Sequence, residues 1–185
     1  MADGRPDGDA ATDVALVARW KAGDERAATE LVARHAPALA RFIAGGTARE
    51  DVDEVVQDAF VRAFSAIGSF RGESSFRTWL FSIARRLVLD RGRAARRNPA
   101  HVALGEGDAA TDFGALDGLI ASETHGRLEA ALRHLTRTQR DVFSLRVGEG
   151  MSYKEIARVL GTTEGAARVH YHNAMRALKE QVDDE

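Results

Sequence analysis

Residues 150–179 read GMSYKEIARVLGTTEGAARVHYHNAMRALK and hold the most specific local pattern in the chain. Ser152 and Glu155 form a capping box, in which each side chain bonds to the backbone amide of the other residue. Gly161 ends the short helix that follows, and one of the two threonines after it caps the next helix. A helix, a short turn containing glycine and a second helix are typical of the helix-turn-helix unit.

The second helix of this unit has two distinct faces. Ala167, Tyr171, Ala174 and Leu178 fall on one stripe at a spacing of about 100° per residue, which predicts that they face the core. In a helix-turn-helix unit bound to DNA, the opposite face and the N-terminal half lie against base edges in the major groove. The candidate DNA-reading residues on this side are Thr163, Glu164, Arg168, Val169, His172, Met175, Arg176 and Lys179.

Upstream of this unit, charge is strongly segregated although the net charge is only −2. Residues 85–97 carry six arginines against one aspartate, whereas residues 98–118 carry four acidic residues and no lysine or arginine. The acidic stretch also holds four glycines and one proline without helical periodicity, so it predicts a flexible linker. The linker would join a domain at 14–97 to a domain at 119–185, and the polar residues 1–13 predict a disordered tail.

The N-terminal domain shows helical spacing throughout, so the expected fold class is all-α, with two small helical domains. Residues 52–67 place valine, alanine and phenylalanine on one broad apolar face and acidic residues on the other. Those acidic residues also suit the positive end of the helix dipole, which leaves simple helix stabilisation as an alternative to a binding role. A further helix is expected from Phe76 to about Arg97, capped by Ser74 or Ser75.

Composition excludes several classes of protein. A chain of 185 residues without cysteine has no disulfide, thiolate metal site or cysteine nucleophile. No apolar run approaches the roughly 18 residues that a membrane helix needs, so a cytoplasmic protein without membrane insertion is expected. His170 and His172 point to different sides of a helix, so no metal site is expected there. Neither a P-loop nor a Ser/His/Asp set occurs, so no catalytic residue and no cofactor are expected.

Three segments in order resemble the extracytoplasmic-function sigma factors, the smallest type in the sigma-70 family of bacterial RNA polymerase. DVDEVVQDAFVRAF at 51–64 is similar to the family's region 2.2, and FRGESSFRTWL at 70–80 to its promoter-melting segment. Residues 135–160, with QRDVF and GMSYKEIA, are similar to region 4. The resemblance implies a factor that binds core RNA polymerase and directs promoter-specific transcription initiation.

The resemblance also implies roles for residues of the N-terminal domain. Contacts with the clamp helices of the largest polymerase subunit would come from Asp51, Asp53, Glu54, Gln57 and Asp58. Capture and melting of −10 DNA would use Phe70, Arg71, Ser74, Ser75, Arg77, Trp79, Arg85 and Arg86. An aromatic surface with hydrogen-bonding groups can offset the loss of stacking when a base leaves the duplex. Phosphate contacts would come from Arg91, Arg93, Arg96 and Arg97.

For the C-terminal domain, the resemblance implies −35 DNA and the flap of the second-largest polymerase subunit as partners. Thr163, Glu164, Arg168, Val169, His172, Arg176 and Lys179 are the −35 candidates. The family commonly has several arginines after the turn, but here Arg168 is followed by His170, Asn173 and Met175. An anti-sigma factor is a further implied partner. A stand-alone helix-turn-helix regulator, whose N-terminal helices only dimerise, remains the alternative.

Overall fold

A computed structural model describes residues 6–97 and 131–183, and within these ranges every regular element is helical. The N-terminal helices are α1 (Pro6–Lys21), α2 (Glu25–Ala44), η1 (Arg49–Asp51), α3 (Val52–Ser65), η2 (Ile67–Ser69) and α4 (Phe76–Arg97). The C-terminal helices are α6 (Arg137–Phe143), the π-helical η4 (Ser144–Gly148), α7 (Tyr153–Leu160) and α8 (Glu164–Asp183). The all-α class is confirmed, and no helix in the described ranges is long and apolar enough to cross a membrane.

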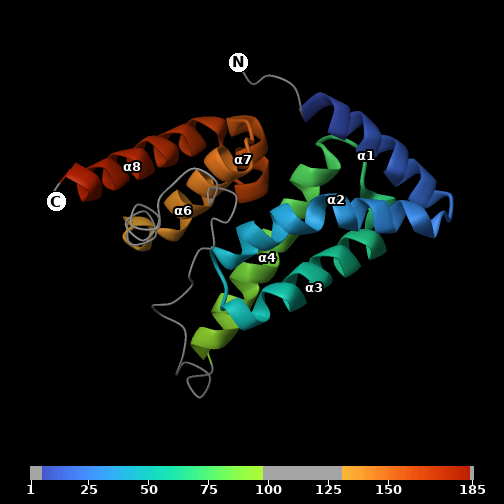
Figure 1. Ribbon diagram of the computed structural model, residues 1–185, viewed down its shortest axis with the longest axis horizontal. Helices are drawn as coiled ribbons and strands as arrows, with labels where there is room; N and C mark the ends of the chain where they lie inside the picture. Colours follow the sequence, from blue (N-terminus) through green and yellow to red (C-terminus); the bar gives the residue numbers. More distant parts are fainter. Residues whose placement is uncertain (1–5, 98–130, 184–185) are drawn as a thin grey trace.

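The N-terminal domain is a bundle in which α2, α3 and α4 pack against one another and α1 closes the side (Figure 1). Asp24 caps α2 by accepting a 3.0 Å hydrogen bond from the Arg26 amide. The Ser75 hydroxyl caps α4 by accepting from the Thr78 amide at 3.1 Å, one of the two caps expected from the sequence. The expected bounds of α4 agree with the structure because both the cap and the apolar spacing are local signals.

The expectation of a disordered tail through residue 13 needs correction for residues 6–13. Helix α1 begins at Pro6, and only 2 % of Asp13 is exposed. The Asp13 carboxylate is paired with Arg34 at 3.0 Å and with His35 at 2.8 Å, both on α2. A buried carboxylate needs such partners, and they come from another helix, so the local composition of residues 1–13 does not reveal them.

The C-terminal domain contains the expected helix-turn-helix unit, formed by α7 and α8. The capping box of Ser152 and Glu155 is present, and Gly161 ends α7 in the left-handed conformation with a φ of 64°. The Thr163 hydroxyl accepts from the Ala166 amide at the start of α8. A second capping box, Thr136 with Gln139, starts α6. Helix α6 ends at Phe143 and continues as the π-helical turn η4.

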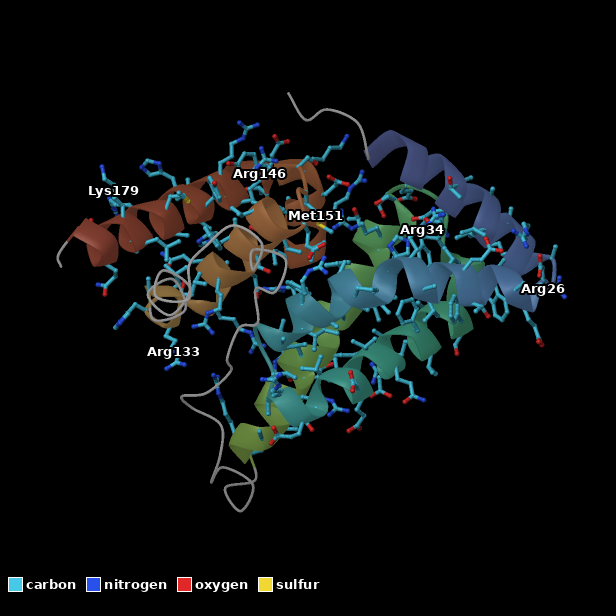
Figure 2. The ribbon with its side chains drawn as sticks, viewed as in Figure 1. Arg26, Arg34, Arg133, Arg146, Met151 and Lys179 are labelled. Atoms are coloured by element: carbon cyan, nitrogen blue, oxygen red, sulfur yellow. The ribbon has the colours of Figure 1, made fainter. Side chains whose placement is uncertain are left out.

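The two domains lie directly against each other, with α4 packed on α7 (Figure 1). Val142, Leu145, Met151 and Ile156 of the C-terminal domain belong to the same apolar cluster as the core of the N-terminal domain. Met151 lies where the domains meet, as Figure 2 shows. A smaller cluster within the C-terminal domain consists of Ala131, Leu132, Leu135, Phe143, Ala174 and Leu178. The expected linker, residues 98–118, lies outside the described residues.

Candidate nucleic-acid interface

A pocket of about 350 Å³ opens beside the start of α4. Its lining comes from the end of η2, the loop that follows and the first turn of α4: Ser69, Phe70, Arg71, Glu73, Ser74 and Trp79. Four of these side chains, Phe70, Arg71, Ser74 and Trp79, were expected from the sequence to handle −10 DNA. The pocket is large enough for a small planar group such as a nucleic-acid base.

The inner wall of the pocket is aromatic. The ring centroids of Phe70 and Trp79 lie 5.1 Å apart, and both rings contact Phe76, which is buried. Trp79 is half-buried, so one part of its ring packs on the core while another part lines the pocket. The apolar spacing of α4 predicts that Phe76, Leu80 and Ile83 pack in the core: Phe76 and Leu80 are buried, and Ile83 is half-buried against the same cluster.

The pocket loop is held by contacts that the sequence pattern does not reveal. Lys21, at the end of α1, donates a 3.0 Å hydrogen bond from Nζ to the Phe70 carbonyl and lies 6.0 Å from the centroid of that ring. The Ser69 hydroxyl donates to the Ala66 carbonyl at 2.7 Å. Gly72 has a φ of 74°, a conformation that favours glycine. Lys21 is 49 residues away in sequence, so no local pattern points to it.

Apart from Arg91, the arginines expected at DNA divide into two groups. Arg71, Arg86, Arg93, Arg96 and Arg97 are exposed. Arg77 and Arg85 instead turn toward the C-terminal domain, where they pair with Glu149 and Asp141. Ser75 is occupied by the cap of α4.

Arg91 lies on the acidic face of α3 rather than with the other basic residues of α4. Its Nη2 is 2.6 Å from Glu54 Oε1 and 3.4 Å from Asp58 Oδ2, and its Nη1 is 3.9 Å from Asp51 Oδ1. The hydrogen bond with Glu54 raises the pKa of the Arg91 guanidinium above its ordinary value. Asp53 and Gln57, the other residues expected at polymerase, are exposed.

The outer face of α8 is open to solvent. The helical spacing predicts that the residues opposite the core stripe face solvent, and all six are exposed: Arg168, Val169, His172, Met175, Arg176 and Lys179. Two guanidinium groups lie over the Tyr153 ring, with Arg146 at 4.9 Å and Arg168 at 5.0 Å from its centroid. Arg146 is further fixed by a 2.8 Å hydrogen bond to the Met151 carbonyl. Figure 2 shows Arg146 and Lys179 along the same edge of the C-terminal domain.

Comparison with known proteins agrees with this arrangement of two helical domains. Residues 31–98 match the model of sigma-70 region 2, and residues 125–178 match that of sigma-70 region 4. The ECF RNA polymerase sigma-E factor of Haemophilus influenzae is 31 % identical over 92 % of this chain and 95 % of its own length. The chain belongs to the extracytoplasmic-function (ECF) group of the sigma-70 family. An Escherichia coli K12 sigma-E factor is also 31 % identical, over 92 % of this chain and 94 % of the relative.

Solved structures also resemble this ECF sigma factor, and two of them are informative here. CnrH in complex with the cytosolic domain of CnrY is 32 % identical, with a TM-score of 0.69 over 94 % of this chain and 98 % of the other. The sigma factor RpoE with the anti-sigma factor NepR, from Bartonella quintana, has a TM-score of 0.65 at 22 % identity, over 84 % and 96 % of the two chains, and shares the fold.

As an ECF sigma factor, the chain directs promoter-specific transcription initiation. The alternative of a stand-alone regulator is not favoured, because the N-terminal helices match region 2 and the C-terminal helices match region 4. In these terms the pocket and the acidic face lie in region 2, and the helix-turn-helix unit lies in region 4. Sequence reasoning missed the contact of Lys21 at the end of α1 and the Arg146–Tyr153 contact in region 4, although the basic and aromatic character of residues 146–154 could have drawn attention to the latter.

Proposed function

We propose that region 2 captures an unpaired base of the −10 element in the pocket beside α4. The observation that carries this proposal is the 350 Å³ cavity with Phe70 and Trp79 in its wall. Extracting a base from the duplex costs a few kcal/mol, and stacking on an aromatic side chain returns about 1 to 3 kcal/mol per base. Ser74 and Arg71 at the same pocket supply hydrogen-bonding groups for the base edge or its phosphate.

Core polymerase would bind the outer face of α3. Asp51, Asp53, Glu54, Gln57 and Asp58 lie on this helix or at its start, and Arg91 contributes one positive charge against four carboxylates. The remaining negative charge and the exposure of Asp53 and Gln57 support a basic partner, for which the clamp helices of the largest polymerase subunit are our candidate. Region 4 would bind the flap of the second-largest subunit.

The −35 element would lie along α8, with its phosphates at the Arg146, Tyr153 and Arg168 cluster. Stacking on a ring restricts a guanidinium group, so less conformational freedom is lost when it binds a phosphate. Val169 is 58 % exposed and Met175 is 41 % exposed, so both offer apolar contact to a base edge or a thymine methyl group. The exposed Arg86, Arg93, Arg96 and Arg97 would add sequence-independent attraction to phosphates.

We further propose that the factor acts in the cytoplasm, has no catalysis of its own and is held inactive by an anti-sigma partner. The anti-sigma proposal is supported by the RpoE–NepR complex, whose sigma factor shares this fold. CnrH, another similar chain, is likewise bound to a second protein, the cytosolic domain of CnrY.

Run-off transcription with purified core polymerase on a library of genomic fragments tests the proposal. We expect defined start sites that depend on the factor and share one −10 and one −35 sequence. The Trp79→Ala variant should lose most of these transcripts while still binding core polymerase. A footprint by the chain alone, with no transcripts when polymerase is added, would contradict the proposal and support the stand-alone regulator.

A further inference from the structure

A carboxylate is buried where regions 2 and 4 meet. Only 3 % of the Glu149 side chain is exposed, and its Oε2 lies 2.6 Å from Nη2 of Arg77. Arg77 also donates from Nη1 to the Glu149 carbonyl at 2.9 Å. On the other side, Arg41 Nη2 lies 3.1 Å from Glu149 Oε1. One residue of region 4 therefore occupies two arginines of region 2, one of them through both its side chain and its backbone.

A third arginine of region 2 makes a similar contact from further along α4. Arg85 donates from Nε to Asp141 Oδ2 at 3.2 Å and from Nη1 to the Leu160 carbonyl at 3.3 Å. Leu160 is the last residue of α7, where the helix carries partial negative charge. Arg85 is thus held by both a carboxylate and a helix C-terminus of region 4.

The carboxylates that make these contacts are largely removed from solvent, with 3 % of the Glu149 side chain and 13 % of the Asp141 side chain exposed. Burial raises the pKa of the Asp141 carboxyl, an effect larger than the opposing attraction of Arg85, and burial also lowers the pKa of Arg137. Arg137 and Arg140 of region 4 donate to the carbonyls of Gly46 and Gly45 in region 2 at 3.2 and 3.5 Å. Together with the shared apolar cluster, these bonds hold the two regions in one closed arrangement.

Arg77 and Arg85 are also two of the arginines expected at −10 DNA, and Arg77 follows the pocket loop directly. In each of these two arginines, two of the five guanidinium donors already meet a carboxylate and a backbone carbonyl of region 4, so the group is held facing region 4 and must turn away to bind a phosphate or a base. We propose that region 4 and −10 DNA compete for Arg77 and Arg85, so that the closed chain masks its own −10 site, with Glu149 as the latch. This inference rests on the proposed role of region 2 in binding −10 DNA.

The masking is one-sided. The outer face of α8 carries the −35 candidates and stays exposed in the closed chain, with 61 % of the Arg168 side chain accessible. Opening is therefore required for −10 contact but not for −35 contact. The apparent affinity of a site equals its intrinsic affinity multiplied by the fraction of molecules in which it is open. Loss of the latch should consequently strengthen binding of single-stranded DNA and leave binding of −35 duplex unchanged.

The first test measures opening without DNA. The chain has no cysteine, so Ser65→Cys on α3 and Glu180→Cys on α8 provide two unique sites for spin labels in the full-length protein. Pulsed electron spin resonance should give one narrow distance distribution in the parent chain and a broad, shifted one in Glu149→Gln. Arg41→Gln removes the other partner of the latch and should open the chain too. Glu30→Gln, which breaks an exposed ion pair with Arg19, is the matched control and should leave the distribution unchanged.

The second test measures binding of a fluorescein-labelled, mixed-sequence single-stranded DNA pool by the same full-length variants. We expect Glu149→Gln and Arg41→Gln to bind about tenfold more tightly than the parent, as an increase in the open fraction from a tenth to nearly all molecules would give. Arg77→Gln should also open the chain but show no such gain, because the DNA contact is lost with the latch. Thermal melting followed by circular dichroism checks that each variant is folded, and Arg41→Gln serves if Glu149→Gln is not.

The outcomes separate the two proposals. Opening with tighter DNA binding supports the latch. If folded Glu149→Gln and Arg41→Gln both keep the parent distance distribution, the latch is wrong, while the role of region 2 at the −10 element is untouched. If both variants open without a gain in DNA binding, region 4 and −10 DNA do not compete for these arginines. In that case, an Arg77→Gln variant that binds single-stranded DNA as tightly as the parent would show that the proposed DNA contact of Arg77 is the wrong step.

Discussion

Arg91 Nη2 lies 2.6 Å from Glu54 Oε1, so the basic end of α4 is joined to the acidic face of α3. The pairing places the proposed polymerase contact and the proposed phosphate contacts on neighbouring helices of region 2. It also means that Arg91 offsets part of the negative charge that polymerase would meet. The acidic face and the arginines of α4 are thus electrostatically coupled, so a change of charge on one of them should also alter binding at the other.

Reversing charge on the acidic face should abolish binding to core polymerase. Asp51→Lys combined with Glu54→Lys replaces two carboxylates near Arg91 by positive charges, so attraction for a basic surface becomes repulsion. Co-purification with core polymerase measures the effect, and circular dichroism should show unchanged helicity. The control is the double reversal Glu25→Lys with Glu30→Lys on α2, which should bind normally. Equal recovery of polymerase by the acidic-face variant and the parent would show that docking does not use this face.

Removing the pocket tryptophan should impair promoter opening more than promoter binding. Trp79→Ala deletes the ring that contacts Phe70 at 5.1 Å, and with it a stacking surface worth about 1 to 3 kcal/mol per base. Permanganate reactivity of thymines, measured on promoter already saturated with holoenzyme, reports opening directly. Trp79→Phe keeps an aromatic ring and should retain most of the reactivity. Normal opening by Trp79→Ala would exclude a role for this ring in melting.

The buried carboxyl of Asp141 should make stability depend on pH in an unusual direction. Its pKa is raised by burial, so the charged form is less favourable in the folded chain than in the unfolded chain. The destabilisation has its full size at pH values above the pKa of Asp141 in the folded chain. It disappears as the pH falls below the ordinary pKa of an aspartate. Asp141→Asn should therefore be at least as stable as the parent near neutral pH, and its advantage should shrink in acid.

Urea denaturation at a series of pH values measures the difference between Asp141→Asn and the parent. The groups that face Asp141 are Arg85 from α4 and Arg137 and Arg140 from α6, and all three stay charged over this range. A variant that is much less stable at neutral pH, with the deficit closing in acid, would mean that attraction to these arginines outweighs burial.

Removal of the Tyr153 ring should leave Arg146 and Arg168 more mobile and so weaken −35 binding, mainly through their phosphate contacts. Tyr153→Leu removes the ring that lies 4.9 and 5.0 Å from Arg146 and Arg168 while keeping an apolar side chain. Holoenzyme affinity for templates with intact and scrambled −35 elements should be measured over a range of salt concentrations. Arg168→Gln is expected to reduce the salt slope by about one if it contacts a phosphate, or to cost about 1 to 3 kcal/mol of base discrimination if it reads a guanine. Unchanged slope and discrimination in both variants would remove this cluster from the DNA interface.

Local signals in the sequence were sufficient for the helix-turn-helix unit and for most of α4. The capping box at Ser152, the left-handed Gly161 and the serine cap at Ser75 each involve residues within a few positions of one another. The pocket loop was also predictable, because an aromatic and polar segment between two helices stands out in the sequence. The start of α1 was not, since Asp13 is stabilised by Arg34 and His35 on another helix.

The sequence by itself determined the all-α class, the helix caps, the outer face of α8 and the family, because these depend on the identity and spacing of neighbouring residues. Only the tertiary structure decided where each arginine of α4 points. Arg77 and Arg85 turn to region 4, Arg91 turns to α3, and Arg86 stays in solvent. Arginines in one helix look alike in sequence, and their partners are carboxylates many residues away. For Arg77 and Arg85 these carboxylates are largely buried where the two regions pack, whereas Arg91 pairs with exposed carboxylates on the neighbouring helix.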